Sequence, residues 1–418
     1  MPDSISKKVF LHKEGKKMQK SIFFKLAGFL VLSLILVIGY SPQQIKAESN
    51  ILNIGVIQPL SGPAAFLTYP MLRSANMAAE DINNAGGVKA GGKNYTIKIV
   101  SADDGYTSAG GVAAFNRLIL KKGVKFVIGS LGSAPTLAAQ PITESNKVII
   151  IHQASSLEAI GKDKPFSFRM FVGAIEGASA FYRWIHSYDK SIKTVAMINP
   201  DDVTGHNTAK YSSKFTRMTG IKVLVSEFYQ RGTQDFRPIL LKMMDKNPDL
   251  IDFGASVDAP VIMKQLLELG YKGRKVLCAA AFPPEIMLKL ATPQAMEGAI
   301  VGYLDPDSPK ATKRYKDIFK RYKEKNDELP GPMGILAYDS LSWLVAAIEK
   351  ANTLDTTKVR DTMAKLPFET SYGIARWKGK EMYGIDRLAI YPSYWSEVRD
   401  GKLVYIGKSE AKLIPMIK

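Results

Sequence analysis

Cysteine is almost absent from this chain of 418 residues, in which Cys278 is the only one. A single thiol excludes an intrachain disulfide, and its position far from the N-terminus excludes a lipid anchor there. Cys278 lies in the apolar segment KVLCAAA (275–281), so we expect a small core residue. A chain of this length buries a large core without crosslinks and more often forms two domains than one.

Long apolar runs are also scarce, and the one that stands out lies near the N-terminus. Residues 26–38 are apolar, follow a lysine-rich stretch (16–25), and are followed by a small residue, Ala47. Thirteen residues are fewer than the roughly 20 that cross a bilayer as a helix. We therefore predict that residues 1–47 are a cleaved signal peptide and that the protein works in the periplasm. The alternatives are an uncleaved membrane anchor and a start at Met18.

Acidic residues are in deficit, with 39 against 57 basic ones and a net charge of +18. The segment 1–47 holds eight lysines and two acidic residues, which leaves 49 basic and 37 acidic residues, a net charge of +12, for the mature chain. No basic stretch is interleaved with aromatic residues, and no nucleic-acid motif is present. The charge therefore indicates a solvated basic surface and no nucleic-acid partner.

The motifs of enzymes are missing as well. We find no GxGxxG after a strand, no P-loop and no GxSxG elbow. Asp103 and Asp104 are adjacent on an extended segment, where successive side chains point to opposite faces, so we expect turn roles for both. His152, at the end of an apolar strand, is expected to be structural. The four histidines lack metal-ligand spacing: His12, His152, His186 and His206. The sequence therefore predicts neither an enzyme nor a cofactor or metal.

Apolar runs and helical patterns alternate along the rest of the chain. Runs without polar interruption are typical of parallel strands that are covered on both faces, so the sequence predicts doubly wound α/β sheets. Long helices are expected at 313–325 and 335–350, and a strand-rich tail at 373–408. The strands are predicted at 51–58, 96–101, 126–128 and 148–151, and in a second series at 194–198, 222–225, 250–253 and 275–277.

Four of these runs end in turns that are rich in glycine or small polar residues. Because the carboxyl ends of parallel strands meet at one sheet edge, backbone N–H groups and hydroxyls there can converge on a ligand. The turns follow the strands in ILNIGVIQPLSG (51–62), YTIKIVSADDG (95–105), KFVIGSLGSAPT (125–136) and VIIIHQASS (148–156).

These stretches resemble the type I periplasmic binding proteins, in particular the branched-chain amino acid class of ABC-transporter receptors. The matching segments are IGVIQPLSG (54–62), AEDINNAGG (79–87), VSADD (100–104), VIGSLGS (127–133) and ASS (154–156). The resemblance implies two α/β lobes joined by three crossings, near 171–173, 302–304 and 371–373. Lobe one would be 50–171 plus 304–371, and lobe two 174–302 plus 373–410.

The resemblance also implies a function. The lobes would close around a small ligand, and a membrane permease and ATPase of an ABC importer would be the partners of a monomeric receptor. A ligand sensor that feeds a signalling system is the alternative, because it would use the same fold and cleft.

In the family, two turns of the first lobe hold the ligand carboxylate. The matching positions here are Ser133, Ala154, Ser155 and Ser156. Short hydroxyls and turn N–H groups suit a carboxylate because charge-assisted hydrogen bonds are strong. The alternative is that these serines cap the helices that follow them.

The second half of the family's amino-acid site departs from the pattern. Where an acidic side chain would pair the ammonium, this chain has AAAFPP (279–284), with Ala281 or Phe282 nearest the position. An unpaired buried ammonium is unfavourable. The pattern therefore favours a carboxylate without an amino group, although Asp258 or Glu285 could still serve an amino acid.

Aromatic and apolar side chains would form the wall of the pocket. Thr204 replaces a tyrosine common in the family, and Leu67, flanked by Phe66 and Tyr69, stands where an aromatic residue is expected. Tyr106 follows the Asp103–Asp104 turn. With Phe282, these residues would suit an aliphatic or aromatic ligand.

Overall fold

The structure is a computed structural model that describes residues 50–418 except 63, 172–173, 255, 278–283, 412 and 414–418. The side chains of 174–175 and 284–286 are also outside the description. The predicted signal peptide, Cys278, Ala281 and Phe282 therefore lie outside the described residues, as does the side chain of Glu285.

The first sheet has nine strands in the order β12-β13-β14-β6-β5-β4-β1-β3-β2. Its central strands β3, β1, β4 and β5 pair in parallel, as the apolar runs predict, and β6, which the sequence does not predict, pairs in parallel with β5. The strands are β1 (Asn50–Gln58), β2 (Val88–Ala90), β3 (Lys93–Asp103), β4 (Phe126–Ile128), β5 (Ile149–His152), β6 (Ser167–Arg169), β12 (Phe368–Thr370), β13 (Gly373–Lys378) and β14 (Leu388–Ile390).

Alternate residues of these strands enter two different cores. Ile128 belongs to a cluster with residues of α2 and α12, whereas its neighbour Val127 belongs to a cluster with residues of α3 and the π-helical segment η1 (Arg117–Lys121). Because side chains of a strand alternate between faces, each face needs its own helical cover. The helices are α2 (Ala65–Asn84), α3 (Ser108–Asn116), α4 (Ser133–Ser145), α11 (Lys313–Asn326), α12 (Gly331–Ala351) and α13 (Thr356–Met363).

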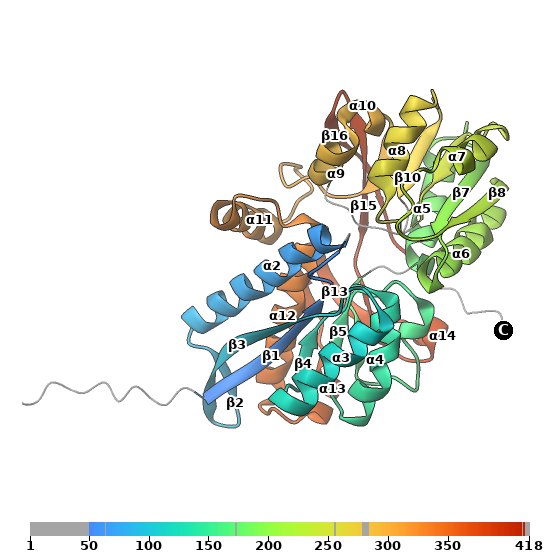
Figure 1. Cartoon of the computed structure of the whole chain (residues 1–418). Coiled ribbons are helices and arrows are strands. Elements are labelled where there is room, and N and C mark those ends of the chain that lie inside the picture. Colours follow the sequence, from blue (N-terminus) through green and yellow to red (C-terminus); the bar gives the residue numbers. More distant parts are fainter. Residues whose placement is uncertain are drawn as a thin grey trace, which may run out of the picture. The chain divides into compact units, whose positions relative to one another are not determined.

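Helix α12 is the central helix of the larger core. It packs along α2, although the two are more than 240 residues apart in the chain (Figure 1). Among the described helices, α12 alone has the length and apolar composition of a membrane span, but here it is buried against α2 and the sheet.

The second sheet has seven strands in the order β16-β15-β11-β10-β9-β7-β8. Strands β7 to β11 pair in parallel, and β15 joins β11 in antiparallel orientation. The strands are β7 (Thr194–Pro200), β8 (Lys222–Tyr229), β9 (Leu250–Asp252), β10 (Arg274–Leu277), β11 (Ala299–Gly302), β15 (Ser393–Arg399) and β16 (Lys402–Ser409). The helices of this part are α5 (Ala174–Tyr188), α6 (Val203–Thr219), α7 (Arg237–Met244), α8 (Ala259–Glu268), α9 (Pro284–Ala291) and α10 (Pro293–Met296).

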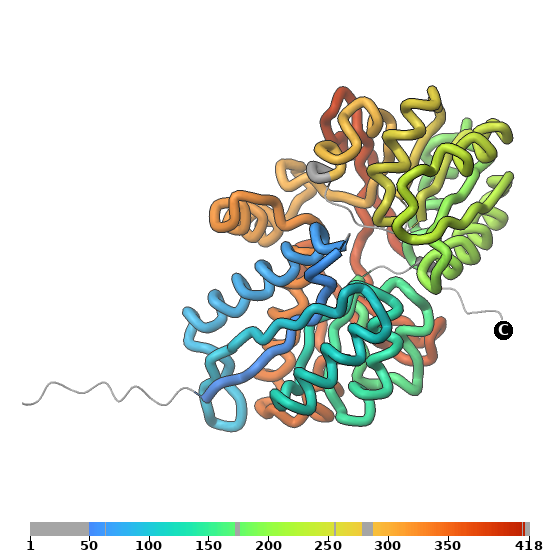
Figure 2. Tube along the Cα trace, viewed as in Figure 1, coloured from blue at the N-terminus to red at the C-terminus, as the bar shows by residue number. Residues whose placement is uncertain are grey.

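The predicted fold class, two doubly wound parallel-sheet lobes, is confirmed. The strand pairing corrects one predicted lobe boundary. The prediction places residues 373–390 in the second lobe. Instead β13 pairs with β14, and β14 pairs with β6 of the first sheet. The tail enters the second sheet only at β15 (Figure 2). The reason is packing: Trp377 of β13 stacks on Trp343 of α12, with ring centroids 4.3 Å apart.

Candidate ligand site at the strand ends

The turn after β4 forms the centre of the candidate site. Its conformation needs glycine at position 129, where φ is +121° and an added Cβ would lie 1.9 Å from the Ile57 carbonyl oxygen. Leu131 N donates to Gln58 Oε1 at 2.9 Å, and Ser130 Oγ donates to Asp104 Oδ2 at 2.5 Å. Burial raises the pKa of Asp104. The turn is therefore held by buried side chains from the ends of β1 and β3.

The four residues predicted to hold the ligand carboxylate, Ser133, Ala154, Ser155 and Ser156, are called the clamp here, and two of them, from different turns, are in contact. Ser156 N donates to Ser133 Oγ at 3.1 Å, and both residues are buried. Ala154 and Ser155 are buried in the same turn as Ser156. Neither serine side chain caps a helix: Gly132 is the N-cap of α4, and Ser156, the N-cap of the short helix η2 (Leu157–Ala159), makes no side-chain capping bond.

The turn that carries Ser156 is also contacted by a helix of the second sheet. Asn207 Nδ2 of α6 donates to Ser156 Oγ at 3.1 Å and to Glu158 Oε2 at 2.9 Å. Ser156 Oγ in turn donates to the same Glu158 oxygen. The N-terminal half of α6, which follows β7 of the second sheet, therefore contacts the turn after β5 of the first sheet.

A second contact between the two sheets involves Tyr106, which sequence reasoning placed in the cleft. An added Cβ on Gly132 would lie 3.2 Å from the Tyr106 ring, so the ring adjoins the clamp turn. The guanidinium of Arg231, which follows β8, lies 5.1 Å from the ring centroid. Arg231 Nε donates at 2.6 Å to Asp202, whose other carboxylate oxygen caps α6 through Gly205 N. Burial raises the pKa of the Tyr106 hydroxyl.

The remaining predicted wall residues are dispersed. Leu67 is buried in the same apolar cluster as Ile198 and Tyr229, which belong to the second sheet. Tyr69 is 44% exposed, and the guanidinium of Arg73 lies 5.9 Å from its ring centroid. Thr204 is buried in the first turn of α6, two residues from Asp202. The structure does not describe Phe282.

Two further residues have the structural roles that the sequence predicts. Asp103 Oδ1 accepts hydrogen bonds from Leu60 N at 2.9 Å and from Gly105 N at 2.8 Å, which is a turn role. His152 is fully buried at the end of β5, and burial, together with the charge of Arg169, lowers its pKa to about 3. His152 is therefore neutral near pH 7. Among the described residues, no cluster of histidine, cysteine or acidic side chains could hold a metal ion.

Sequence reasoning missed Arg231, Asp202 and Asn207. Arg231 lies in the polar segment YQRGTQD (229–235), where a charged residue is ordinarily solvated. Asp202 and Asn207 follow β7, and Arg231 follows β8. The three residues come together because β7 and β8 are neighbours in the second sheet. Sequence patterns alone carry no signal for this pairing.

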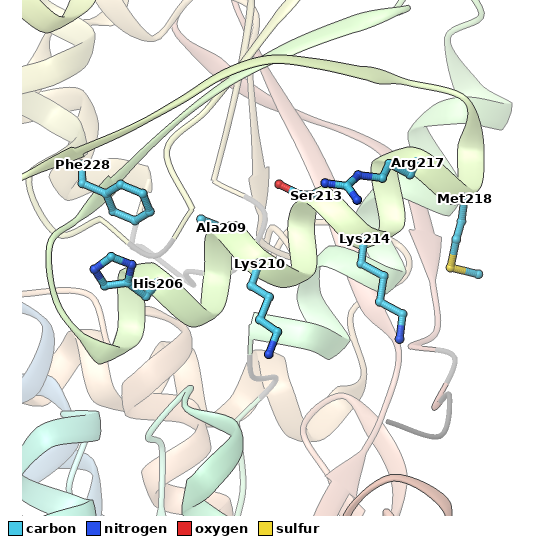
Figure 3. Close-up of a pocket in the computed structure, with 8 residues that line it drawn as sticks. All are labelled: His206, Ala209, Lys210, Ser213, Lys214, Arg217, Met218 and Phe228. Carbon is cyan, nitrogen blue, oxygen red and sulfur yellow. The ribbon is translucent and has the colours of Figure 1, made fainter. Parts of the chain in front are cut away.

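A surface hollow of about 640 Å³ lies elsewhere, along the outer side of α6 and next to β8 (Figure 3). It contains none of the predicted site residues. Its lining residues are His206, Ala209, Lys210, Ser213, Lys214, Arg217, Met218 and Phe228.

The chain belongs to the periplasmic binding protein family, whose model matches residues 52–402. This is a family of solute-binding proteins rather than enzymes. An amino acid binding protein from Pseudomonas aeruginosa is 26% identical over 377 residues, which cover 90% of this chain and 97% of the relative.

Solved structures share the fold. The branched-chain amino acid transporter substrate binding protein LivJ of Streptococcus pneumoniae, in complex with isoleucine, is 21% identical with a TM-score of 0.75 and covers 87% of this chain and 99% of that chain. A solute binding protein of an ABC transporter from Rhodopseudomonas palustris, in complex with 3,4-dihydroxybenzoic acid, is 20% identical with a TM-score of 0.74. The match covers 86% of this chain and 98% of that chain.

Proposed function

We propose that this protein is the periplasmic receptor of an ABC importer and that it captures a small carboxylate without an amino group, aromatic or aliphatic. The signal peptide would deliver it to the periplasm, and a membrane permease and ATPase would receive the ligand. The family membership and the ABC-transporter proteins of the same fold support this role.

The clamp of the first sheet supports a carboxylate ligand. Ser133 and Ser156 are buried hydroxyls at two adjoining turns, with neighbouring backbone N–H groups. Such donors stabilise an anion without bulk, because each hydrogen bond to a carboxylate is charge-assisted. Lobe closure would then cover the bound carboxylate.

Arg231 is the observation that carries the choice against an amino acid. It brings a cation from the second sheet to Tyr106, beside the clamp turn. Its Nη1 is buried and has no hydrogen-bond partner among the described residues. A ligand ammonium near this guanidinium would be repelled, whereas an acceptor group on the ligand would gain a donor.

The carboxylates around the site are already engaged. Asp202 pairs with Arg231, and Glu158 accepts from Ser156 and Asn207. Asp258, one of the two alternatives for an ammonium partner, accepts from the Tyr229 hydroxyl at 2.8 Å. At Asp202 an ammonium would have to compete with the guanidinium of Arg231, which supports a ligand without an ammonium.

Ligand-induced stabilisation of the mature chain, from residue 48, tests the proposal. Leucine, isoleucine and valine would be compared with benzoate, 3,4-dihydroxybenzoate and aliphatic keto acids at equal concentration. A ligand at 100 times its Kd raises the free energy of unfolding by about 2.7 kcal/mol, a clear shift in Tm. Stabilisation only by acids without an amino group is expected; stabilisation by the three amino acids would contradict the ligand class but keep the receptor role.

A further inference from the structure

A fully buried arginine, Arg169, lies at the end of β6 and is not among the residues predicted to touch the ligand. Burying a guanidinium is unfavourable unless its charge and its N–H groups are paired. Arg169 Nη2 donates to Glu176 Oε1 at 2.8 Å, and Glu176 is itself buried. The pair is therefore tightly constrained, because separating it would leave two charges buried without partners.

The ion pair spans the point where the chain leaves the first sheet. Arg169 is the last residue of β6, and Glu176 lies in the first turn of α5. The apolar residues of α5, such as Phe181, pack in one cluster with Val195 and Met197 of β7, in the second sheet. Arg169 thus connects a strand of the first sheet to a helix of the second.

Arg169 also holds the turn that carries Ser156. Its Nη1 donates to the Ser156 carbonyl oxygen at 2.9 Å, and Ala159 N donates to the same oxygen at 3.3 Å. The N–H of Ser156 donates to Ser133 Oγ, as described above. The turn is therefore held by two hydrogen bonds: Arg169 binds the Ser156 carbonyl oxygen, and Ser133 binds the Ser156 N–H.

Tyr383 completes this arrangement from a third segment of the chain. It lies in the short helix α14 (Lys380–Tyr383), between β13 and β14. Its hydroxyl is 2.7 Å from Arg169 Nη2 and also donates to Glu176 Oε1. The hydroxyl therefore orients both members of the ion pair.

We propose that Arg169, Glu176 and Tyr383 are positioning residues that couple the Ser156 turn to helix α5. The buried Arg169–Glu176 pair stays intact when the lobes open and close. The Asn207–Ser156 hydrogen bond, which is only part-buried, breaks and re-forms. The ligand affinity of the turn then depends on side chains that do not touch the ligand. The coupling to affinity rests on the proposed function; the coupling of the turn to α5 does not.

Amide hydrogen exchange of the ligand-free mature chain tests the coupling. Tyr383→Phe removes the hydroxyl that orients both members of the ion pair. We expect at least fivefold faster exchange in 153–160 and in 174–180, with other segments within twofold. The matched control is Tyr271→Phe, which removes a part-buried hydroxyl bonded to the carbonyls of Pro248 and Arg274, remote from Arg169. It should leave both segments within twofold.

Two results would overturn the proposal: unchanged exchange in 153–160, or equal acceleration throughout the chain, as simple destabilisation would give. Glu176→Gln is the second variant if Tyr383→Phe does not fold, and the same two segments should respond. Because no ligand is present, a silent ligand panel leaves this result intact, and a failed exchange test leaves the receptor role intact.

Discussion

The two sides of the candidate site are built in different ways. On the first-sheet side, short turns are fixed by buried hydrogen bonds, such as Leu131 N to Gln58 and Ser156 N to Ser133. On the second-sheet side, longer side chains such as Arg231 and Asn207 extend from α6 and from the segment after β8. Hydrogen bonds hold the turns of the first side, whereas a single substitution can change the side chain that the second side presents. We infer that the first side binds the carboxylate, the group that amino acids and other carboxylic acids have in common. The second side would then determine which other groups the ligand can carry.

Gly129→Ala should give the largest effect, because it acts on the first side. The new Cβ would overlap the Ile57 carbonyl oxygen at 1.9 Å, in a left-handed backbone conformation. We expect a loss of about 3 kcal/mol or more in the free energy of unfolding, together with loss of binding. Urea denaturation measures the loss.

The matched control for this substitution is Gly105→Ala. Gly105 also has a positive φ, of +55°, but nothing lies within 4 Å of its added Cβ. Only the backbone cost of about 1 kcal/mol should remain. Equal losses for the two variants would mean that the turn after β4 is not specially constrained.

Arg231→Gln tests the second side. Removing the cation leaves Asp202 without its partner and the ligand without a donor, so binding of an acid without an amino group should weaken by about 2 kcal/mol, roughly 30-fold. Isothermal titration calorimetry with the acid that stabilises the chain most measures the change.

Arg237→Gln is the control, because Arg237 is an exposed arginine paired with Asp235 in the same part of the chain. It should bind the acid as the parent chain does. If Arg231→Gln instead lost no affinity for the acid, the second side would select its ligand by other residues.

The difference between the two sides also explains what could be predicted. Strand ends followed by small residues predict a ligand site. The structure brings two of those turns together at Ser133 and Ser156, and ligand binding there stays a prediction. Arg231 could not be found, because its role depends on which strands are neighbours in the second sheet. The same reason applies to β13 and β14: a short strand pattern does not specify the sheet edge that the strand joins.

The smallest effect is expected from Ser133→Ala, although it acts at the clamp itself. The Ser133 hydroxyl accepts the Ser156 N–H, and the backbone donors of both turns would remain for a carboxylate. Loss of this hydroxyl should therefore weaken binding by about 1 kcal/mol, roughly fivefold, and should also lower Tm, because the buried Ser156 N–H loses its acceptor. Ser145→Ala, at an exposed position at the end of α4, serves as the control in the same titration. Unchanged affinity in Ser133→Ala would place the carboxylate elsewhere and remove the division of roles between the two sides.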